Sequence, residues 1–192
     1  RVGLVAFPPG GADPRKSVSV FATYTWSPMF EALTTFDEDT LLRPELAEKW
    51  ETVEPTTWRF TIKPGILFSN GRPLTAQDIA DNLAWLRTPL GATTPVARQL
   101  SSVSGTRVID ERTLDIETAA PNAILPRELS ALYIVDPDVW VRLGPDGFAQ
   151  APIGTGPFIL RRWSPAKIVY DPNPLSWRRP IVNGLELLEL SE

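Results

Sequence analysis

Apolar residues alternate with polar ones in several stretches of the chain, and this alternation predicts three β-hairpins. The predicted strand pairs are residues 50–53 with 57–63, 106–110 with 113–118, and 158–163 with 167–170. In a regular strand, residues two positions apart point to the same face. We therefore expect Trp58 and Phe60 to face a core and Arg59 to face solvent.

Residues 67–79 combine a strand end, a tight turn and a helix start. Asn70-Gly71 predicts the turn, because both residues tolerate a positive φ angle. Thr75 is a good N-cap, and Asp78 places a carboxylate in the positive first turn of the helix. Glu or Gln is the usual partner at that position, so this is an approximate capping box. A helix is expected over residues 76–87.

Further elements are indicated by caps, prolines and short apolar runs. Helices are expected at residues 28–33, 44–49, 95–103, 122–132 and 136–143, and strands at 2–7, 133–135 and 185–190. The first of these helices has an alternative: it starts before Pro28, which would then kink it. The last is expected to stop at Gly144-Pro145.

Composition limits the classes of protein. The chain has 192 residues, 20 prolines and a net charge of −4, which suit one large or two small domains without long helices. No basic patch is evident, so we expect no nucleic-acid partner. No apolar run is long enough to span a membrane. Residues 1–7 are too short for a signal peptide, which fits a mature secreted chain or a cytosolic one equally.

The chain lacks cysteine and histidine, which removes the usual zinc ligands and Ser-His-Asp or Cys-His catalysis. Residues 37–39 are three contiguous acids, which suit a solvated turn better than a calcium loop. Asp110, Glu111 and Asp115 invite comparison with glycosidase acids, but the first two lie at an expected hairpin turn. Residues 154–156 lack the Lys of a phosphate loop and favour a tight crossover. We expect no metal, no cofactor and no catalytic site.

Several blocks of sequence carry a resemblance. They are Phe30-Glu31-Ala32-Leu33, Arg43 to Trp50, Trp58 to Gly65, Leu67 to Ile79, and Pro152 to Phe158. In this order and spacing they resemble the extracellular solute-binding proteins of peptide and nickel ABC importers, family 5. The resemblance covers nearly the whole chain. It is specific because the blocks occur together, whereas each block alone is weak.

The resemblance implies an α/β (mixed α+β) fold: lobe I of a periplasmic-binding-protein-like molecule with an inserted subdomain. The insert would be residues 44–152, and residues 1–43 and 153–192 would share one sheet. Pro44 and Pro152 would mark the seams. The chain would end at the point where, in the family, the first lobe connects to the second. The second lobe is therefore expected to be missing.

The resemblance also implies ligand contacts. The residues expected to contribute them are Val18, Ser19, Val20, Tyr24, Trp26, Ala97, Arg98, Tyr133 and Gly156. Extended backbone after Asp13-Pro14 could pair with a peptide, as in strand addition. Oligopeptide-binding relatives carry an acid near the position of Val18, which this chain lacks. Ala97 and Tyr133 replace the Trp and Arg of nickel-binding relatives, so the class of ligand stays open.

The implied function is the substrate-binding component of an ABC importer, which captures a peptide-like or other small solute and delivers it to a membrane permease. It would be periplasmic or extracellular and associated with the membrane through the transporter. The alternative is a ligand-sensing domain of a transcriptional regulator with the same fold. An enzyme is disfavoured. We expect one lobe alone to bind ligand much more weakly than two, and its open groove to favour self-association at high concentration.

Overall fold

The computed structural model describes residues 1–8, 11–15 and 20–190 and, for Val20 and Phe21, the backbone alone. The chain forms two compact units, each with a four-stranded sheet and helices, so the fold is mixed α+β as predicted. Unit 1 comprises residues 1–31, 66–73 and 135–192, and unit 2 comprises residues 32–65 and 74–134.

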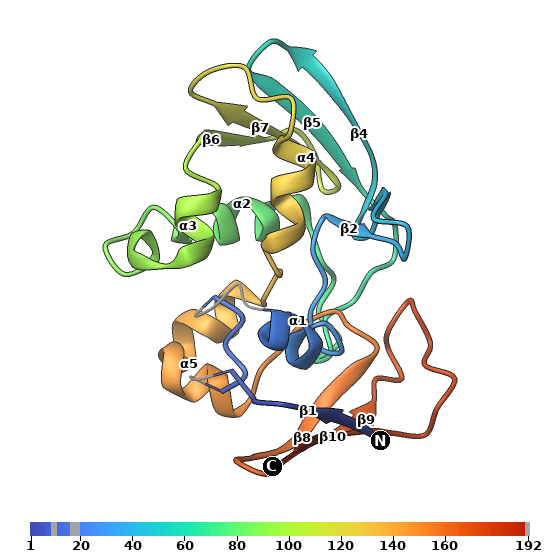
Figure 1. The fold of residues 1–192 in the computed structure, drawn as a ribbon. Helices are drawn as coiled ribbons and strands as arrows, with labels where there is room; N and C mark the ends of the chain where they lie inside the picture. Colours follow the sequence, from blue (N-terminus) through green and yellow to red (C-terminus); the bar gives the residue numbers. More distant parts are fainter. Residues whose placement is uncertain (9–10, 16–19, 191–192) are drawn as a thin grey trace. The chain divides into compact units, whose positions relative to one another are not determined.

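Unit 1 contains a sheet built from both ends of the chain. Its elements are β1 (Val2–Leu4), α1 (Val20–Trp26), α5 (Pro137–Gln150), β8 (Phe158–Ser164), β9 (Lys167–Pro172) and β10 (Leu185–Glu189). The strand order is β1-β10-β9-β8; β1 is parallel to β10, and the other neighbours are antiparallel (Figure 1). The third predicted hairpin is thus present as β8 and β9, and β1 shares their sheet as expected.

The core of unit 1 gathers side chains from distant segments. The rings of Phe30 and Phe148 stack with centroids 6.2 Å apart. The fully buried Tyr170 donates its hydroxyl proton to the carbonyl oxygen of Thr25 at 2.7 Å. Burial raises the pKa of Tyr170, which keeps this hydroxyl protonated as a donor.

Helix α5 is interrupted where the sequence predicts its end. Gly144 has φ 67° and ψ 174°, outside the helical region, and only glycine adopts such angles easily. The helix nevertheless resumes at Pro145 and continues to Gln150, which the sequence analysis missed. Proline suits the first turn of a helix because it lacks an N–H that would be unpaired there.

Unit 2 is built on two antiparallel hairpins that meet side by side. Its strands are β2 (Thr34–Phe36), β3 (Leu42–Pro44), β4 (Ala47–Glu54), β5 (Thr57–Ile62), β6 (Val103–Val108) and β7 (Thr113–Thr118). Its helices are α2 (Ala76–Trp85), η1 (Gly91–Thr93), α3 (Pro95–Gln99), α4 (Leu125–Glu128) and η2 (Leu129–Ala131). The main sheet has the order β4-β5-β7-β6, and β2 pairs with β3 separately. The first two predicted hairpins and the helix after Thr75 are confirmed.

Strand β5 is regular, as the sequence predicts. Its pairing with β7 runs without interruption from Thr57 to Thr61, so Trp58 and Phe60 lie on one face. Phe60 is fully buried and stacks on Trp50 with ring centroids 6.1 Å apart. Trp58 is half-buried and donates its indole N–H to the carbonyl oxygen of Asn122 at 2.9 Å. Arg59 lies on the other face, half-buried rather than fully in solvent.

The helix predicted at residues 28–33 is wrong. Helix α1 lies earlier and ends at Trp26, so the alternative of an earlier start is closer, although Pro28 follows the helix instead of kinking it. The carbonyl oxygens of Pro28 and Met29 accept hydrogen bonds from Phe158 N and Gly156 N, both at 2.9 Å. These backbone groups are thereby used between segments and do not continue a helix.

The helix predicted at residues 44–49 is also wrong. The backbone N–H groups of Glu45 and Ala47 donate to the carbonyl oxygen of Leu33, and β3 pairs with β2. Pairing with neighbouring strands overrode the local helical signal of residues 44–49.

Two expectations near Pro126 and Tyr133 need correction. Residues 133–135 form no strand, and the single helix expected at 122–132 is instead α4 followed by η2. Pro126 lies in the first turn of α4, where it is tolerated, and is not an interior break.

The observed units differ in their boundaries from the predicted seams at 43/44 and 152/153. The changes between units fall at 31/32 and 134/135, and residues 66–73 belong to unit 1. Pro44 ends β3 inside unit 2. Residues 66–73 join unit 1 through hydrogen bonds such as Ser69 N to Gly154 O at 2.8 Å. Neither Pro44 nor Pro152 lies at a change between these two compact units, and the predicted insert of residues 44–152 stays a prediction.

Candidate functional site

The crossover at residues 154–156 packs closely against the backbone of residues 28–29. A Cβ atom on Gly154 would lie 2.3 Å from the carbonyl oxygen of Met29, and one on Gly156 would lie 2.5 Å from the carbonyl oxygen of Pro28. The N–H of Gly156 donates to Met29, and its carbonyl oxygen accepts from Asn173 Nδ2 at 2.8 Å. These glycines permit close backbone approach, as the sequence predicts, and the N–H of Gly156 is used within the unit and not turned toward a phosphate.

A buried carboxylate lies beside this crossover. Glu31 is fully buried and accepts hydrogen bonds from Thr155 Oγ1 at 2.8 Å, Trp177 Nε1 at 2.9 Å and Arg178 Nε at 2.6 Å. Two segments, at residues 155 and 177–178, are thereby held on one side chain. Glu31 is absent from the residues predicted from sequence, although a carboxylate inside the apolar run of residues 29–33 indicates a buried partner.

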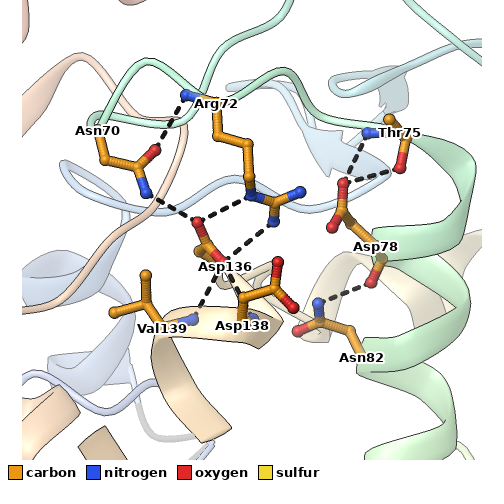
Figure 2. Close-up of polar contacts among 8 residues, drawn as sticks. All are labelled: Asn70, Arg72, Thr75, Asp78, Asn82, Asp136, Asp138 and Val139. Carbon is orange, nitrogen blue, oxygen red and sulfur yellow. Dashed lines mark hydrogen bonds and ion pairs between the residues drawn. The ribbon is translucent and has the colours of Figure 1, made fainter. Parts of the chain in front are cut away.

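A second buried carboxylate anchors the Asn70-Gly71 turn. Asp136 accepts hydrogen bonds from Asn70 Nδ2 at 2.9 Å and from Arg72 Nε and Nη2 at 3.1 and 3.0 Å (Figure 2). It also caps α5 by accepting from the backbone N–H groups of Asp138 and Val139. Burial alone would raise the pKa of Asp136, but these hydrogen bonds, led by that from Arg72, outweigh it and lower the pKa.

Figure 2 also shows the cap of α2 within unit 2. Asp78 Oδ2 accepts from the backbone N–H of Thr75 at 2.8 Å and from its hydroxyl at 2.9 Å. Asn82 donates its amide N–H to the backbone carbonyl of Asp78 at 2.8 Å. Asp78 therefore replaces the Glu or Gln of a standard capping box, as the sequence predicts.

The predicted ligand residues of unit 1 lie in different environments. Val18 and Ser19 are outside the described residues, and Val20 begins α1. Tyr24 is 57% exposed on α1, whereas Trp26 is buried and donates its indole N–H to the carbonyl oxygen of Gly11 at 3.2 Å. Of these residues, Tyr24 has a side chain exposed to solvent, whereas Trp26 and Gly156 form hydrogen bonds with the backbone of neighbouring segments.

The remaining predicted ligand residues belong to unit 2. Ala97 and Arg98 lie on α3, the first half-buried and the second exposed. The N–H of Ala97 donates to Thr94 Oγ1, the N-cap of that helix, at 3.3 Å. Tyr133 is half-buried in the extended segment after η2. All nine ligand contacts stay predictions.

The acidic residues that the sequence offered as metal or catalytic candidates make hydrogen bonds within turns and between strands. Asp37 accepts hydrogen bonds from the backbone of Asp39 and Leu41 and from Arg43 Nε, which makes residues 37–41 a closed turn. Asp115 is fully buried and accepts two bonds from Arg59, at 2.7 and 2.9 Å, and one from Arg107 at 2.7 Å. Among the described residues, no group of three acidic side chains is arranged to hold a metal ion. Within the same residues, no helix is long and apolar enough to cross a membrane.

Comparison with known proteins finds a matching family model and similar individual sequences. The sequence model of the family described as Bacterial extracellular solute-binding proteins, family 5 Middle, matches residues 42–188. The HTH-type transcriptional regulator SgrR of Pectobacterium atrosepticum is 35% identical over 136 residues, which are 70% of this chain and 23% of the regulator.

Solved structures share the fold. OppA of Burkholderia pseudomallei matches with a TM-score of 0.89 and 23% identity, over 98% of this chain and 41% of that one. Haemophilus influenzae OppA, in complex with the peptide RPPGFSPFR, matches with a TM-score of 0.87 and 26% identity, over 97% of this chain and 41% of that one. The chain therefore spans 23% of the regulator's length and 41% of the OppA chains.

Proposed function

This chain belongs to family 5 of the bacterial extracellular solute-binding proteins, and we propose that it forms one lobe of a two-lobed protein that captures a small solute for an ABC importer. The lobes would close around the ligand by hinge motion, and the closed form would dock on a membrane permease. This would place the protein in the periplasm or outside the cell. It would act by binding and not by catalysis.

The observation that carries this proposal is the match to peptide-bound OppA over 97% of the chain. It supports an extended, peptide-like ligand. We propose that Val18, Ser19, Val20 and Tyr24 contribute contacts from the start of unit 1, where Tyr24 is exposed. The set would be completed by Trp26, Ala97, Arg98, Tyr133 and Gly156.

Calorimetry tests the two-lobe mechanism. The natural full-length protein and the chain of residues 1–192 would be titrated with the same ligand, identified by mass spectrometry of what co-purifies with the full-length protein. Losing the contacts of one lobe should weaken binding by about a hundredfold or more, since each tenfold corresponds to about 1.4 kcal/mol. Equal affinities would show that one lobe carries recognition alone and would refute the mechanism.

A second candidate is the ligand-sensing part of a transcriptional regulator. The 35% identity to the HTH-type regulator SgrR favours it. The natural gene discriminates between the two: a secretory signal before Arg1 supports import, whereas a helix-turn-helix region supports regulation. Cell fractionation with an antibody against the protein gives an independent answer, because the importer component would be released with the periplasm.

A further inference from the structure

Unit 1 contains a cavity that none of the residues assigned to the proposed ligand lines. It has a volume of about 510 Å³, within the usual range for small-molecule sites. The residues that line it are Gly11, Asp146, Ala149, Gln150, Leu160, Arg161, Arg162 and Trp163. They come from the loop after β1, the second segment of α5, and β8. None belongs to the predicted ligand set.

A β-bulge brings two arginines together at this cavity. Leu160 pairs with Tyr170 and Arg162 with Val169, so Arg161 is an extra residue in β8. Bulges of this kind re-aim side chains and are common near functional sites. Arg161 lies 3.5 Å from Asp171 in an exposed ion pair, which contributes little to holding it. Two adjacent guanidinium groups repel one another, and a bound anion would relieve that repulsion.

The walls of the cavity are held in place. The ring of Trp163 meets that of Phe7 edge to face with centroids 6.3 Å apart. The carbonyl oxygen of Gly11 accepts from Trp26, and a Cβ on Gly11 would lie 3.5 Å from the Cβ of Ala149. Strand β8 also lies at the edge of the sheet formed by the described strands, where backbone groups face away from β9. The cavity thus joins a fixed apolar wall to a cationic edge.

We propose that this cavity is a binding site for a small organic carboxylate with an apolar body. Arg161 and Arg162 would bind the carboxylate, because a guanidinium fork matches its two oxygens. Leu160, Ala149 and Trp163 would contact the apolar part. The lining holds two arginines and one acid, Asp146, and Asp171 pairs with Arg161 from outside the lining. This site would be distinct from the proposed solute site, since none of its lining residues belongs to the assigned ligand set.

Calorimetry with phenylacetate, at millimolar concentrations and on the natural full-length protein, tests the site. Phenylacetamide serves as the uncharged analogue and inorganic phosphate as the anion without an apolar body. The test variant is the double substitution Arg161→Gln with Arg162→Gln. The matched control is Arg142→Gln, an exposed arginine on α5 that does not line the cavity. Far-ultraviolet circular dichroism confirms that each variant folds.

We expect phenylacetate to bind, and the double variant to bind it at least about tenfold more weakly, the equivalent of about 1.4 kcal/mol. The Arg142 variant should match the natural protein. Undetectable phenylacetate binding, or equal binding by the double variant, would overturn the proposal. Equal affinity for phenylacetamide would refute the role of charge, and equal affinity for phosphate would refute the apolar half of the site. Loss of the natural solute's binding in the double variant would contradict the separation of the two sites.

Discussion

The two units place their buried carboxylates in different structural surroundings. In unit 1, Glu31 accepts a hydrogen bond from Thr155, 124 residues away, and Asp136 accepts one from Asn70, 66 residues away. In unit 2, Asp115 accepts from Arg59, 56 residues away, and from Arg107, 8 residues away, and both arginines lie directly opposite it on the strands that pair with β7. Unit 1 is thus assembled by polar clusters between loops, whereas unit 2 is assembled by strand pairing with a polar cluster added to its sheet.

Glu31→Gln should have the largest effect. The variant removes a buried charge that has three donors, and breaking a buried pair by removing one partner costs about 3–5 kcal/mol; we expect about 3 kcal/mol because Arg178 is partly exposed. Urea unfolding measures the loss. Hydrogen exchange should increase in β8 and β9 more than in β5 and β7. Asp171→Asn, in an exposed pair, is the control and should cost under about 1 kcal/mol. Equal exchange in both units would contradict the comparison.

Gly156→Ala should cause the second-largest loss of stability. Its Cβ would lie 2.5 Å from backbone atoms of Pro28 and Met29, which cannot move independently of the crossover. Overpacking of this kind costs about 1–3 kcal/mol, and we expect a value near the upper end. Gly184→Ala is the matched control, since the nearest atom to its Cβ would be 3.4 Å away. Thermal unfolding of both variants compares them, and similar midpoints would show that the crossover is loosely packed.

Lowering the pH should reduce the free energy of unfolding of both units. Hydrogen bonding from Arg59 is the main cause that lowers the pKa of Asp115, and hydrogen bonds from Arg72 and Asn70 lower that of Asp136 despite burial. Folded pKa values below the unfolded ones mean that the unfolded chain binds more protons in acid. The stabilisation is therefore present above about pH 4 and is lost as the pH falls through the folded pKa.

The free energy of unfolding, measured at about pH 6 and at about pH 3, gives the size of this loss. In Asp136→Asn, the protection of amide hydrogens from exchange in β8 and β9 should depend less on pH than in the natural protein. In Asp115→Asn, the same should hold for β5 and β7. An unchanged pH dependence in either variant would show that the carboxylate it removes does not account for acid sensitivity.

Trp58→Phe should have the smallest effect. It removes the hydrogen bond from the indole N–H to the carbonyl oxygen of Asn122 and leaves strand pairing intact, so the expected cost is about 1 kcal/mol. Urea unfolding provides the value. A cost as large as that of Glu31→Gln would mean that unit 2 also depends on polar contacts between distant segments, and the comparison would fail.

The alternation of apolar residues in 50–63 and 106–118 was sufficient to predict the hairpins of unit 2, because a strand's two faces are a local property. The Asn70-Gly71 turn and the Thr75 cap were predictable for the same reason: each depends on residues within three or four positions. The helices expected at 28–33 and 44–49 failed because their backbone groups bond to other segments: residues 28–29 to residues 156–158, and residues 45–47 to residues 32–33.

For the candidate site, the sequence determined the family, the tight crossover at 154–156 and a set of expected ligand contacts. It did not show that Glu31 and Asp136 hold the loops around that crossover, nor that Arg161 is an extra residue beside a cavity. Those facts depend on which distant segments meet. The side-chain partners of Glu31 and Asp136 are 64 or more residues away, and the bulge at Arg161 depends on how β8 pairs with β9, so the order of amino acids alone indicates neither.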